Sequence, residues 1–322
     1  MKRQIYSCIS GCSGMLLLVC LLAGCSSRHE EMPITTTSVE ARKFFIEGRE
    51  LYENLREDEA RELFYQAIEK DQNFALCHYY LADAAASAVD YHTHLVLAVQ
   101  LAPKVSEGER LLIESLRARA ENDPVRARRK MEELVQLYPN DKRAHRMLGY
   151  LFRRVDEERA IAEYEAAVKL DKNYAPAHNN LGYAYKRKGE FEKAIKAFKK
   201  YSDLLPDEAN PHDSIAELYK KMGKYEESIE HYKKALELRP TFAFSHRQIG
   251  ENLIFLGNFE EARFMFEEVQ ELDVTPNKKA DALQMIAHSY VYEFKYDEAL
   301  AACDRAMEFA ASQNLPEWQA TL

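Results

Sequence analysis

The feature that most constrains how this chain can fold is a repeat of 34 residues in its second half. From residue 141 onward, small residues, aromatic residues and glycines return in register at three positions of the unit: Ala160, Ala194, Ser228 and Ala262; Tyr164, Phe198, Tyr232 and Phe266; Gly189, Gly223 and Gly257. A fixed period of this length is typical of repeat architectures, in which each unit packs only on its neighbours. The repeat therefore predicts a stacked array of units and not one globular core.

Each unit predicts two antiparallel helices, with the glycine near its middle allowing the turn between them. Small residues such as Gly182 and Ala194 lie where helices approach closely, and large ones such as Leu181 and Phe198 fill the grooves beside them. In period, position and residue type, the units resemble the tetratricopeptide repeat. This resemblance implies an all-α fold, a right-handed superhelical solenoid of antiparallel helix pairs with a concave inner surface.

The repeat extends in both directions with decreasing regularity. Less regular units cover residues 41–74, 75–104 and 105–140, and a last unit at 280–313 follows a short insertion. We therefore expect a solenoid of about seven helix pairs over residues 40–310. Residues 311–322 resemble the start of another first helix. They are either an incomplete helical stub that packs as a cap, or a sign that the chain is a truncated form of a longer protein.

The N-terminus has the layout of a secretory signal. Lys2 and Arg3 precede a compact apolar run at residues 15–22, which is far shorter than the roughly 20 residues that a membrane-spanning helix needs. The sequence Leu22-Ala23-Gly24-Cys25 resembles the bacterial lipobox. This resemblance implies that residues 1–24 are a lipoprotein signal peptide and that the thiol of Cys25 receives a diacylglycerol. An ordinary secretory signal and an uncleaved anchor are the alternatives.

The residues after the lipobox predict where the mature protein is held. Ser26 follows the cysteine, which in this class of lipoprotein implies forwarding to the outer membrane, with the protein facing the periplasm. Residues 25–39 show neither helical nor strand periodicity. We therefore expect the lipidated cysteine and a flexible tether to hold the folded part off the lipid surface.

The sequence contains no motif that indicates catalysis. A Gly-rich phosphate loop, an HExxH helix, a GxSxG elbow and paired CxxC motifs are all missing from it. The net charge is -9 and no basic tract dominates, so the chain repels nucleic acid overall. We expect a protein that is not an enzyme, with no catalytic residue and no cofactor, and with no nucleic-acid partner.

Histidines recur at one repeat position, four residues into each first helix: His78, His145, His178, His212 and His246. Equivalent positions of neighbouring repeats lie about 10 Å apart, whereas metal–ligand bonds measure about 2 Å, so these side chains cannot share one ion. We interpret them as packing residues and expect no metal site. The motif His92-Thr93-His94 is too weak a pattern to indicate one. Cys77 and Cys303 lie in distant repeats and are expected to be free thiols, with Cys77 partly exposed.

The resemblance also implies where a partner binds, because in this family the first helix of each unit lines the concave wall. The corresponding positions here are mostly basic or aromatic: Arg143, Arg146, Tyr150, Arg153, Arg154, Asn179, Tyr183, Lys186, Arg187, Lys220, Lys221 and Arg247. Basic groups predominate although the whole chain is acidic, so we expect a groove for a partner segment that carries carboxylates. The alternative is that these residues form solvated helix faces.

Together these features predict a membrane-anchored scaffold or adaptor of the bacterial cell envelope that binds protein partners in its concave groove. Two other hypotheses remain open at this stage. One is a peptidoglycan-associated or glycan-associated lipoprotein, and the other is a truncated form of a longer enzyme or signalling protein. The fold supports many roles, so it does not select the partner or the envelope pathway.

Overall fold

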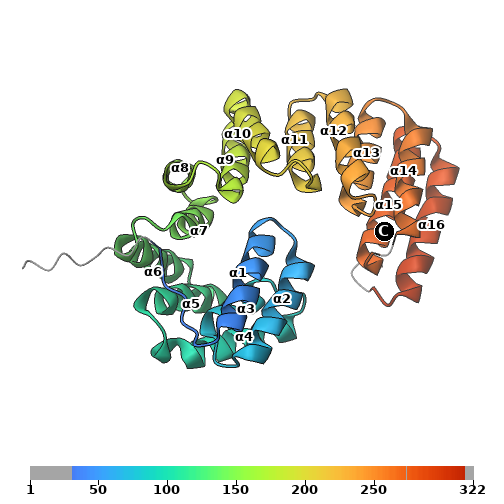
Figure 1. Cartoon of the computed structure of the whole chain (residues 1–322). Helices are drawn as coiled ribbons and strands as arrows, with labels where there is room; N and C mark the ends of the chain where they lie inside the picture. The colour runs from blue at the N-terminus through green and yellow to red at the C-terminus, as the bar shows by residue number, and fades with distance from the viewer. Residues whose placement is uncertain (1–30, 273, 316–322) are drawn as a thin grey trace, which may run out of the picture.

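The computed structural model describes residues 31–272 and 274–315, which form a curved array of helices (Figure 1). These residues contain sixteen α-helices, one short 3-10 helix (Ala102–Lys104) and no strand. The α-helices are α1 (Val39–Glu53), α2 (Glu57–Lys70), α3 (Ala75–Asp83), α4 (Ala88–Leu101), α5 (Glu107–Ala120), α6 (Pro124–Leu137), α7 (Lys142–Phe152), α8 (Glu157–Leu170), α9 (Ala175–Lys188), α10 (Phe191–Leu204), α11 (Ala209–Lys221), α12 (Tyr225–Leu238), α13 (Ala243–Phe255), α14 (Phe259–Glu271), α15 (Pro276–Tyr292) and α16 (Tyr296–Ser312). The predicted all-α solenoid is confirmed.

Consecutive helices form eight antiparallel pairs in this part of the chain, from α1 with α2 to α15 with α16. This is one pair more than the expected number of about seven, and the helices span Val39–Ser312. The period breaks in the first third of the chain, where α3 has only 9 residues.

The expected signal peptide and Cys25 lie outside the described residues, and so do residues 316–322 of the expected stub. Residues 31–38 belong to the expected flexible tether, but the structure places them in a defined extended path against α5 and α7. The backbone N–H groups of Met32 and Thr35 donate hydrogen bonds to Asp141 and Glu109, and these bonds hold the segment in place. None of the described helices combines the length and the apolar character needed to cross a membrane.

Glycines at the crossing points bring the two helices of a pair into close contact. A Cβ atom built on Gly182 of α9 would lie 2.4 Å from Cε1 of Phe198 on α10, and one on Gly250 would lie 2.4 Å from Cε1 of Phe266. Both phenylalanine rings are fully buried. The sequence interpretation of Gly182 as a close-approach position is therefore confirmed. A side chain at either glycine would push the aromatic ring out of its place between the helices.

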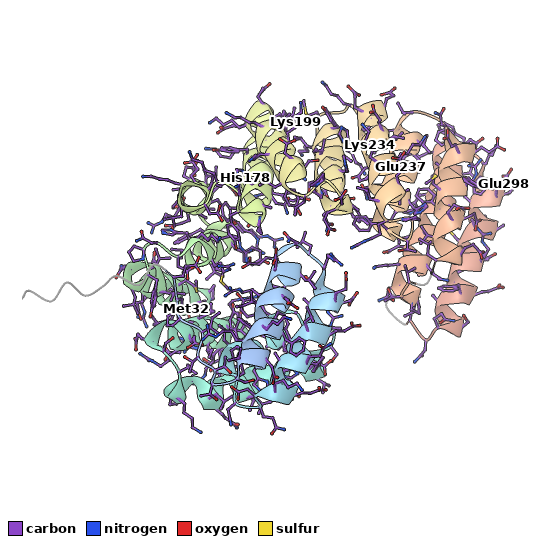
Figure 2. All side chains as sticks on the ribbon, in the orientation of Figure 1. Met32, His178, Lys199, Lys234, Glu237 and Glu298 are labelled. Atoms are coloured by element: carbon purple, nitrogen blue, oxygen red, sulfur yellow. The ribbon has the colours of Figure 1, made fainter. Side chains whose placement is uncertain are left out.

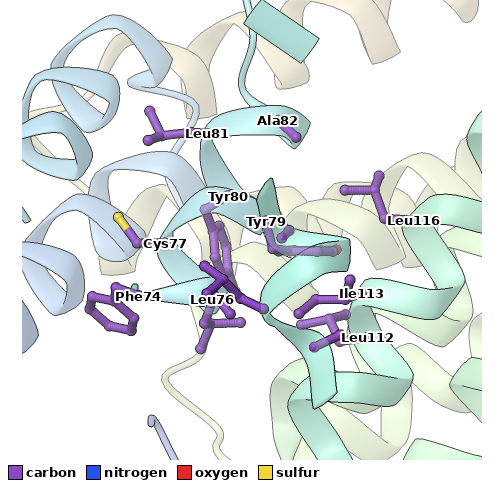
Figure 3. Close-up of a cluster of buried hydrophobic side chains, with 14 of the residues drawn as sticks. Phe74, Leu76, Cys77, Tyr79, Tyr80, Leu81, Ala82, Leu112, Ile113 and Leu116 are labelled. Carbon is purple, nitrogen blue, oxygen red and sulfur yellow. The ribbon is translucent and has the colours of Figure 1, made fainter. Parts of the chain in front are cut away.

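The interior of the N-terminal pairs is one continuous apolar cluster that reaches from α1 to α7. Figure 3 shows part of it, with Leu76 and Tyr80 of α3 lying near Leu112 and Ile113 of α5. Cys77 belongs to the same cluster; it is 0% exposed, and its Sγ lies 3.2 Å from the carbonyl oxygen of Phe64. The expectation that Cys77 is partly exposed was wrong, because the short helix α3 is buried along almost its whole length.

The N-terminal pairs curl back beneath the arc that the later pairs form, so that α1 and α2 face α9 to α11 (Figure 1). Two contacts link the turn between α1 and α2 to the start of α11. Arg56 donates a hydrogen bond to Glu208 at 3.2 Å, and the Asn210 amide nitrogen donates to the carbonyl of Asn54 at 3.4 Å. Residues more than 150 positions apart in sequence therefore lie side by side.

Candidate binding surface

The first helices of successive units line the inner face of the arc, and charged side chains on α9, α11 and α13 connect them. Lys186 of α9 contacts Glu217 of α11, and Lys220 of α11 contacts Glu251 of α13 in the same manner. Lys220 also donates to Gln248 Oε1 at 2.7 Å, and Arg247 lies 3.0 Å from Glu251. We call these five charged residues, Lys186, Glu217, Lys220, Arg247 and Glu251, the inner ladder.

A buried polar layer lies beside the inner ladder. Ser214 of α11 donates to the Asn179 side-chain oxygen at 3.2 Å and lies 3.2 Å from the Tyr183 hydroxyl. Ser245 of α13 donates to Asp213 at 3.1 Å. Burial, reinforced by the neighbouring Glu217 carboxylate, raises the pKa of Asp213 to about 7. A carboxyl group at this position can change its charge near neutral pH.

Carboxylates of the chain itself neutralise most of the basic residues predicted to line the groove. Lys186, Lys220 and Arg247 are all matched by carboxylates from the chain itself, and Arg187 makes two hydrogen bonds to Glu157. Arg154 and Lys221 are exposed, and neither has an ion-pair partner among the described residues. Among the predicted groove residues that the structure describes, the cations of α9, α11 and α13 therefore alternate with carboxylates, and Arg154 and Lys221 remain unmatched near the C-terminal ends of α7 and α11.

The two arginines predicted at the N-terminal end of the groove are engaged inside the molecule. Arg143 Nε donates to Glu53 at 3.0 Å, and Arg146 Nε donates to the Tyr174 hydroxyl at 2.9 Å. The Glu53 side chain is only 5% exposed, and a second Arg146 nitrogen lies 4.0 Å from it. Glu53 of α1 and Tyr174 therefore engage the two guanidinium groups, which are largely buried.

Tyr150 and Arg153 lie next to these arginines and form a pair of their own. The Arg153 guanidinium lies 3.4 Å from the centre of the Tyr150 ring and donates to the Tyr150 carbonyl at 2.6 Å. Tyr150 is 39% exposed. A stacked guanidinium and phenol with this exposure can contact an incoming side chain.

The inward curl forms a partly open chamber of about 290 Å³ between the N-terminal pairs. Its lining comes from α1, α3, α5, α6, α7, α9 and the start of α2: Tyr52, Glu53, Leu55, Glu57, Tyr79, Asp83, Ser115, Arg119, Met131, Arg146, Met147, Tyr150, Leu151 and Asn180. Asp83 accepts hydrogen bonds from Tyr52 at 2.7 Å and from Arg119 at 3.0 Å. Burial and the Asp83 carboxylate raise the pKa of Tyr52, so its hydroxyl stays protonated.

Sequence reasoning identified Arg146 and Tyr150 but missed the other charged residues of this chamber, which are Glu53, Glu57, Asp83 and Arg119. These four residues come from the first three helix pairs, where the repeat pattern is weakest. No spacing in the sequence relates Glu53 to Arg143, since the contact arises only from the curl of the array. No pattern in the sequence could therefore have predicted this chamber.

Four of the five recurring histidines make structural contacts, which fits their interpretation as packing residues. The Nε2 atoms of His78, His145, His178 and His246 lie within 3.1 Å of the backbone carbonyl six residues earlier, in the turn that leads into the helix. His145 also contacts Glu163 at 2.6 Å, and His94 of the HxH motif lies 3.0 Å from His78. Within residues 31–272 and 274–315, no three His, Cys, Asp or Glu side chains are grouped so as to hold a metal ion.

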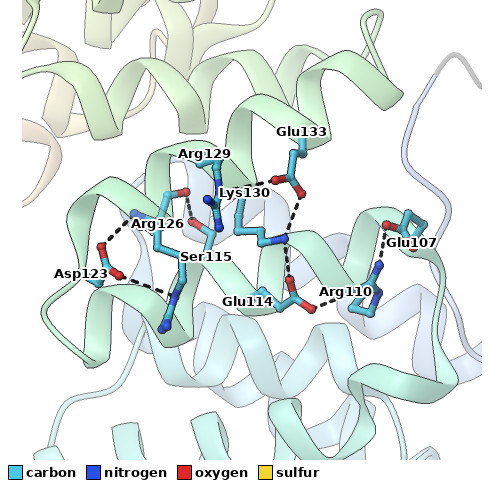
Figure 4. Close-up of polar contacts among 10 residues, drawn as sticks. Glu107, Arg110, Glu114, Ser115, Asp123, Arg126, Arg129, Lys130 and Glu133 are labelled. Carbon is cyan, nitrogen blue, oxygen red and sulfur yellow. Dashed lines mark hydrogen bonds and ion pairs between the residues drawn. The ribbon is translucent and has the colours of Figure 1, made fainter.

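Many charged residues belong to solvated faces instead of a site. Figure 4 shows a chain of such contacts on α5 and α6, in which Glu114 lies 2.9 Å from Arg110 and 3.2 Å from Lys130. Lys130 in turn lies 2.9 Å from Glu133. Pairs as accessible as these contribute about 0–1 kcal/mol each. These charged residues of α5 and α6, none of which was predicted to line the groove, therefore form a solvated face.

Family models match the regular part of the chain. Residues 157–189 match the TPR repeat, residues 175–207 and 214–242 match the tetratricopeptide repeat, and residues 248–273 match a second tetratricopeptide repeat model. The chain therefore contains tetratricopeptide repeats, and its fold is a TPR-like solenoid. No curated protein matches the sequence.

Solved structures share this fold. A human IFIT1 dimer with m7Gppp-AAAA is 18% identical, with a TM-score of 0.58 over 84% of this chain and 72% of that one. The Pseudomonas aeruginosa pilF protein is 17% identical, with a TM-score of 0.50 over 67% of this chain and 98% of that one. MamA is 25% identical, with a TM-score of 0.44 over 49% of this chain and 92% of that one. The repeats and the fold support a protein–protein interaction scaffold.

Proposed function

We propose that this protein is a lipid-anchored scaffold of the bacterial cell envelope, which binds segments of partner proteins along the inner face of α9, α11 and α13. The observation that carries the binding role is the inner ladder beside its buried polar layer on the concave side of the repeats. Concave repeat surfaces of this kind bind extended chains. The anchoring role rests on the lipobox-like Leu22-Ala23-Gly24-Cys25.

The charge pattern indicates what a partner segment carries. Because Lys186 and Lys220 already hold carboxylates, a purely acidic segment has to compete with Glu217 and Glu251. Arg154 and Lys221 are exposed without such competitors. We propose that carboxylates of the partner bind at these two cations, while its other polar groups meet the alternating charges of the ladder.

A charge-swap pair tests the inner face without disturbing the fold. The double variant Lys186→Glu with Glu217→Lys keeps an internal ion pair and leaves the contacts of Glu251 with Lys220 and Arg247 in place, but it reverses the charges that a partner meets. The matched control is Lys234→Glu with Glu230→Lys, which swaps an exposed pair within α12. A photo-crosslinker at position 221 should capture a partner in living cells, whereas one at the outward-facing Lys199 should not (Figure 2).

The inner swap should lower the yield of that crosslink about tenfold, since like charges across an interface cost at least 1.4 kcal/mol. The outer swap should leave the yield unchanged. Equal capture from positions 221 and 199, or equal effects of the two swaps, would refute binding along the inner face.

The anchor has its own test, which is independent of the partner. Cells fed a fatty acid with a clickable tag should label the wild-type protein, and the Cys25→Ser variant should lose the label and leave the membrane fraction. Cys20→Ser is the matched control, because it changes a neighbouring cysteine outside the lipobox. Label retained by Cys25→Ser would rule out lipidation at this cysteine.

A further inference from the structure

Residues 31–38 lie across α5 and α7 in the manner of a bound peptide. Their exposure alternates: Met32, Ile34, Thr36 and Ser38 are partly buried, and Glu31, Pro33, Thr35 and Thr37 are exposed. An extended chain has a period of two, so this alternation means that one edge of the segment faces the protein and the other faces solvent. We call residues 31–38 the cis segment; Figure 2 shows Met32 beside the N-terminal helix pairs.

Carboxylates at the N-termini of two helices accept hydrogen bonds from the cis segment. The Met32 N–H donates to Oδ2 of Asp141, the N-cap of α7, at 2.8 Å. The Thr35 N–H donates to Oε1 of Glu109 in α5 at 2.8 Å, and the Thr35 hydroxyl donates to the other oxygen of Glu109. A third carboxylate, Asp71, accepts from the Thr36 hydroxyl at 2.6 Å.

The apolar side chains of the cis segment cover a depression in the N-terminal core. Met32 and Ile34 pack against a surface formed by Tyr80, Leu112, Leu134 and Met147. At Gly108 a Cβ atom would lie 2.8 Å from Cγ of Met32 and 2.5 Å from the Tyr138 ring. The groove therefore fits the methionine closely and leaves no space for a side chain at position 108.

The groove requires an occupant that supplies hydrogen-bond donors. Glu109 is 0% exposed and Asp141 is 4% exposed. The Ser106 hydroxyl and the N–H groups at the start of α7 satisfy only part of these two carboxylates. If the cis segment leaves, Glu109 Oε1 and Asp141 Oδ2 lose these donors, and the apolar surface that Met32 and Ile34 cover becomes exposed to water, which is unfavourable. A replacement must therefore offer N–H groups with the same three-residue spacing.

We propose that this groove is a binding site for an extended segment of a partner protein, which the cis segment occupies until it is displaced. The cis segment defines the pattern that fits: an apolar residue, any residue, a second apolar residue and then a threonine or serine, as in Met32-Pro33-Ile34-Thr35. The partner's backbone donates to Asp141 and Glu109, and its hydroxyl donates to Glu109. The site is separate from the inner ladder and does not depend on the function proposed above.

The cis segment has a large advantage over any free peptide, because a short covalent connection gives it an effective concentration in the millimolar range. The test therefore weakens the cis segment and leaves the groove intact. In the full chain, the double variant Met32→Asp with Ile34→Asp removes the two apolar contacts. A fluorescent nonapeptide with the sequence of residues 30–38 should bind this variant at least about tenfold more tightly than it binds the wild type, as measured by anisotropy.

Two controls make this result specific. A peptide that carries aspartate in place of its methionine and isoleucine should not bind. Adding Glu109→Gln to the double variant should weaken binding of the original peptide about tenfold, because one acceptor of the Thr35 donors becomes a donor itself. Glutamine still supports a capping box, so the start of α5 should remain helical.

A second measurement covers the case in which the double variant is not folded. Millimolar nonapeptide added to the wild-type chain should accelerate hydrogen exchange at the Met32 and Thr35 amides, because it displaces the cis segment. Unchanged exchange at saturating peptide, or equal binding of the aspartate peptide, would overturn the proposal. Wild-type dimers that Met32→Asp abolishes would also overturn it, since the groove would then belong to a second copy of this chain.

Discussion

Arg143 Nε donates a hydrogen bond to Glu53 Oε1 at 3.0 Å, although the two residues are 90 positions apart in the chain. This contact ties the end of the first helix to the seventh, and Arg146 lies close to the same carboxylate. A regular stack of repeats would place α1 far from α7, because each unit contacts only its neighbours. The contact is therefore the clearest sign that the N-terminal pairs curl inward and form the chamber.

Replacing Glu53 should weaken this arrangement substantially. The variant Glu53→Gln removes the buried counter-charge that two largely buried guanidinium groups share, so the free energy of unfolding should fall by about 3 kcal/mol. Urea unfolding followed by circular dichroism measures this change. Glu59→Gln is the control, since its ion pair with Arg56 is accessible and should contribute less than about 1 kcal/mol. If both variants lower the free energy of unfolding by the same small amount, apolar packing alone holds α1 in place.

Gly182 should be intolerant of any side chain. The added methyl group in Gly182→Ala would lie 2.4 Å from the buried Phe198 ring, so overpacking should cost about 1–3 kcal/mol of stability. Gly189→Ala meets no atom within 4 Å and should cost only the penalty of its positive φ of 76°, about 1 kcal/mol. Thermal unfolding of both variants compares them. If Phe198→Leu does not restore part of the loss at Gly182, the clash is not its cause.

Asp213 should make the stability of the protein depend on pH. Its pKa is raised from 3.8 to about 7, so the folded state holds the proton more tightly than the unfolded state does. This contribution to stability is complete below pH 3.8 and is lost as pH rises through about 7. Asp213→Asn should therefore be more stable than the wild type at pH 8, by about 2–4 kcal/mol, with little difference at pH 4.

Denaturant midpoints measured from pH 4 to pH 8 test this expectation. The control is Asp203→Asn, which changes an exposed aspartate on the neighbouring α10. The groups that face Asp213 are Glu217, Ser245 and Lys186, and all of them remain in the variant. A wild-type pH profile that Asp213→Asn does not flatten would assign the dependence to another group.

The recurring histidines should contribute to stability and not to metal binding. His178→Ala removes the contact between Nε2 and the Lys172 carbonyl, which measures 2.9 Å, and should cost about 1 kcal/mol. His92→Ala, at an exposed position, should cost much less. Zinc at micromolar concentration should leave the melting temperatures of the wild type and of both variants unchanged. A zinc-dependent rise that His178→Ala removes would show that the packing interpretation is incomplete.

The regular units could be predicted from sequence because their structure is local. Gly182 and Phe198 are only 16 positions apart, and they meet because both helices of one pair must cross there. The same reasoning placed Tyr183, Lys186 and Lys220 on the inner face. It could not show that Lys186 and Lys220 are already paired, because Glu217 and Glu251 come from the next unit and the pairing depends on how one unit rotates against another.

The cis segment shows the opposite case. Residues 31–38 have no helical or strand periodicity, so the sequence predicted a flexible tether, and nothing near them in the chain indicates otherwise. Their partners, Glu109 and Asp141, lie 74 and 109 positions away. An extended chain without a sheet partner has no internal hydrogen bonds, so only a surface supplied by the rest of the fold can hold it in place.

By itself, the sequence determined that this protein is a stack of helix pairs, where the regular units begin and end, and which residues fill the contact between the helices of each pair. Those features depend on a repeated spacing, and burial of the same apolar face in every unit enforces them. The tertiary structure alone decided the inward curl, the chamber at Glu53, the charge pairing of the inner face and the path of residues 31–38. These features depend on small rotations between irregular units, which accumulate along the array and which no local spacing specifies.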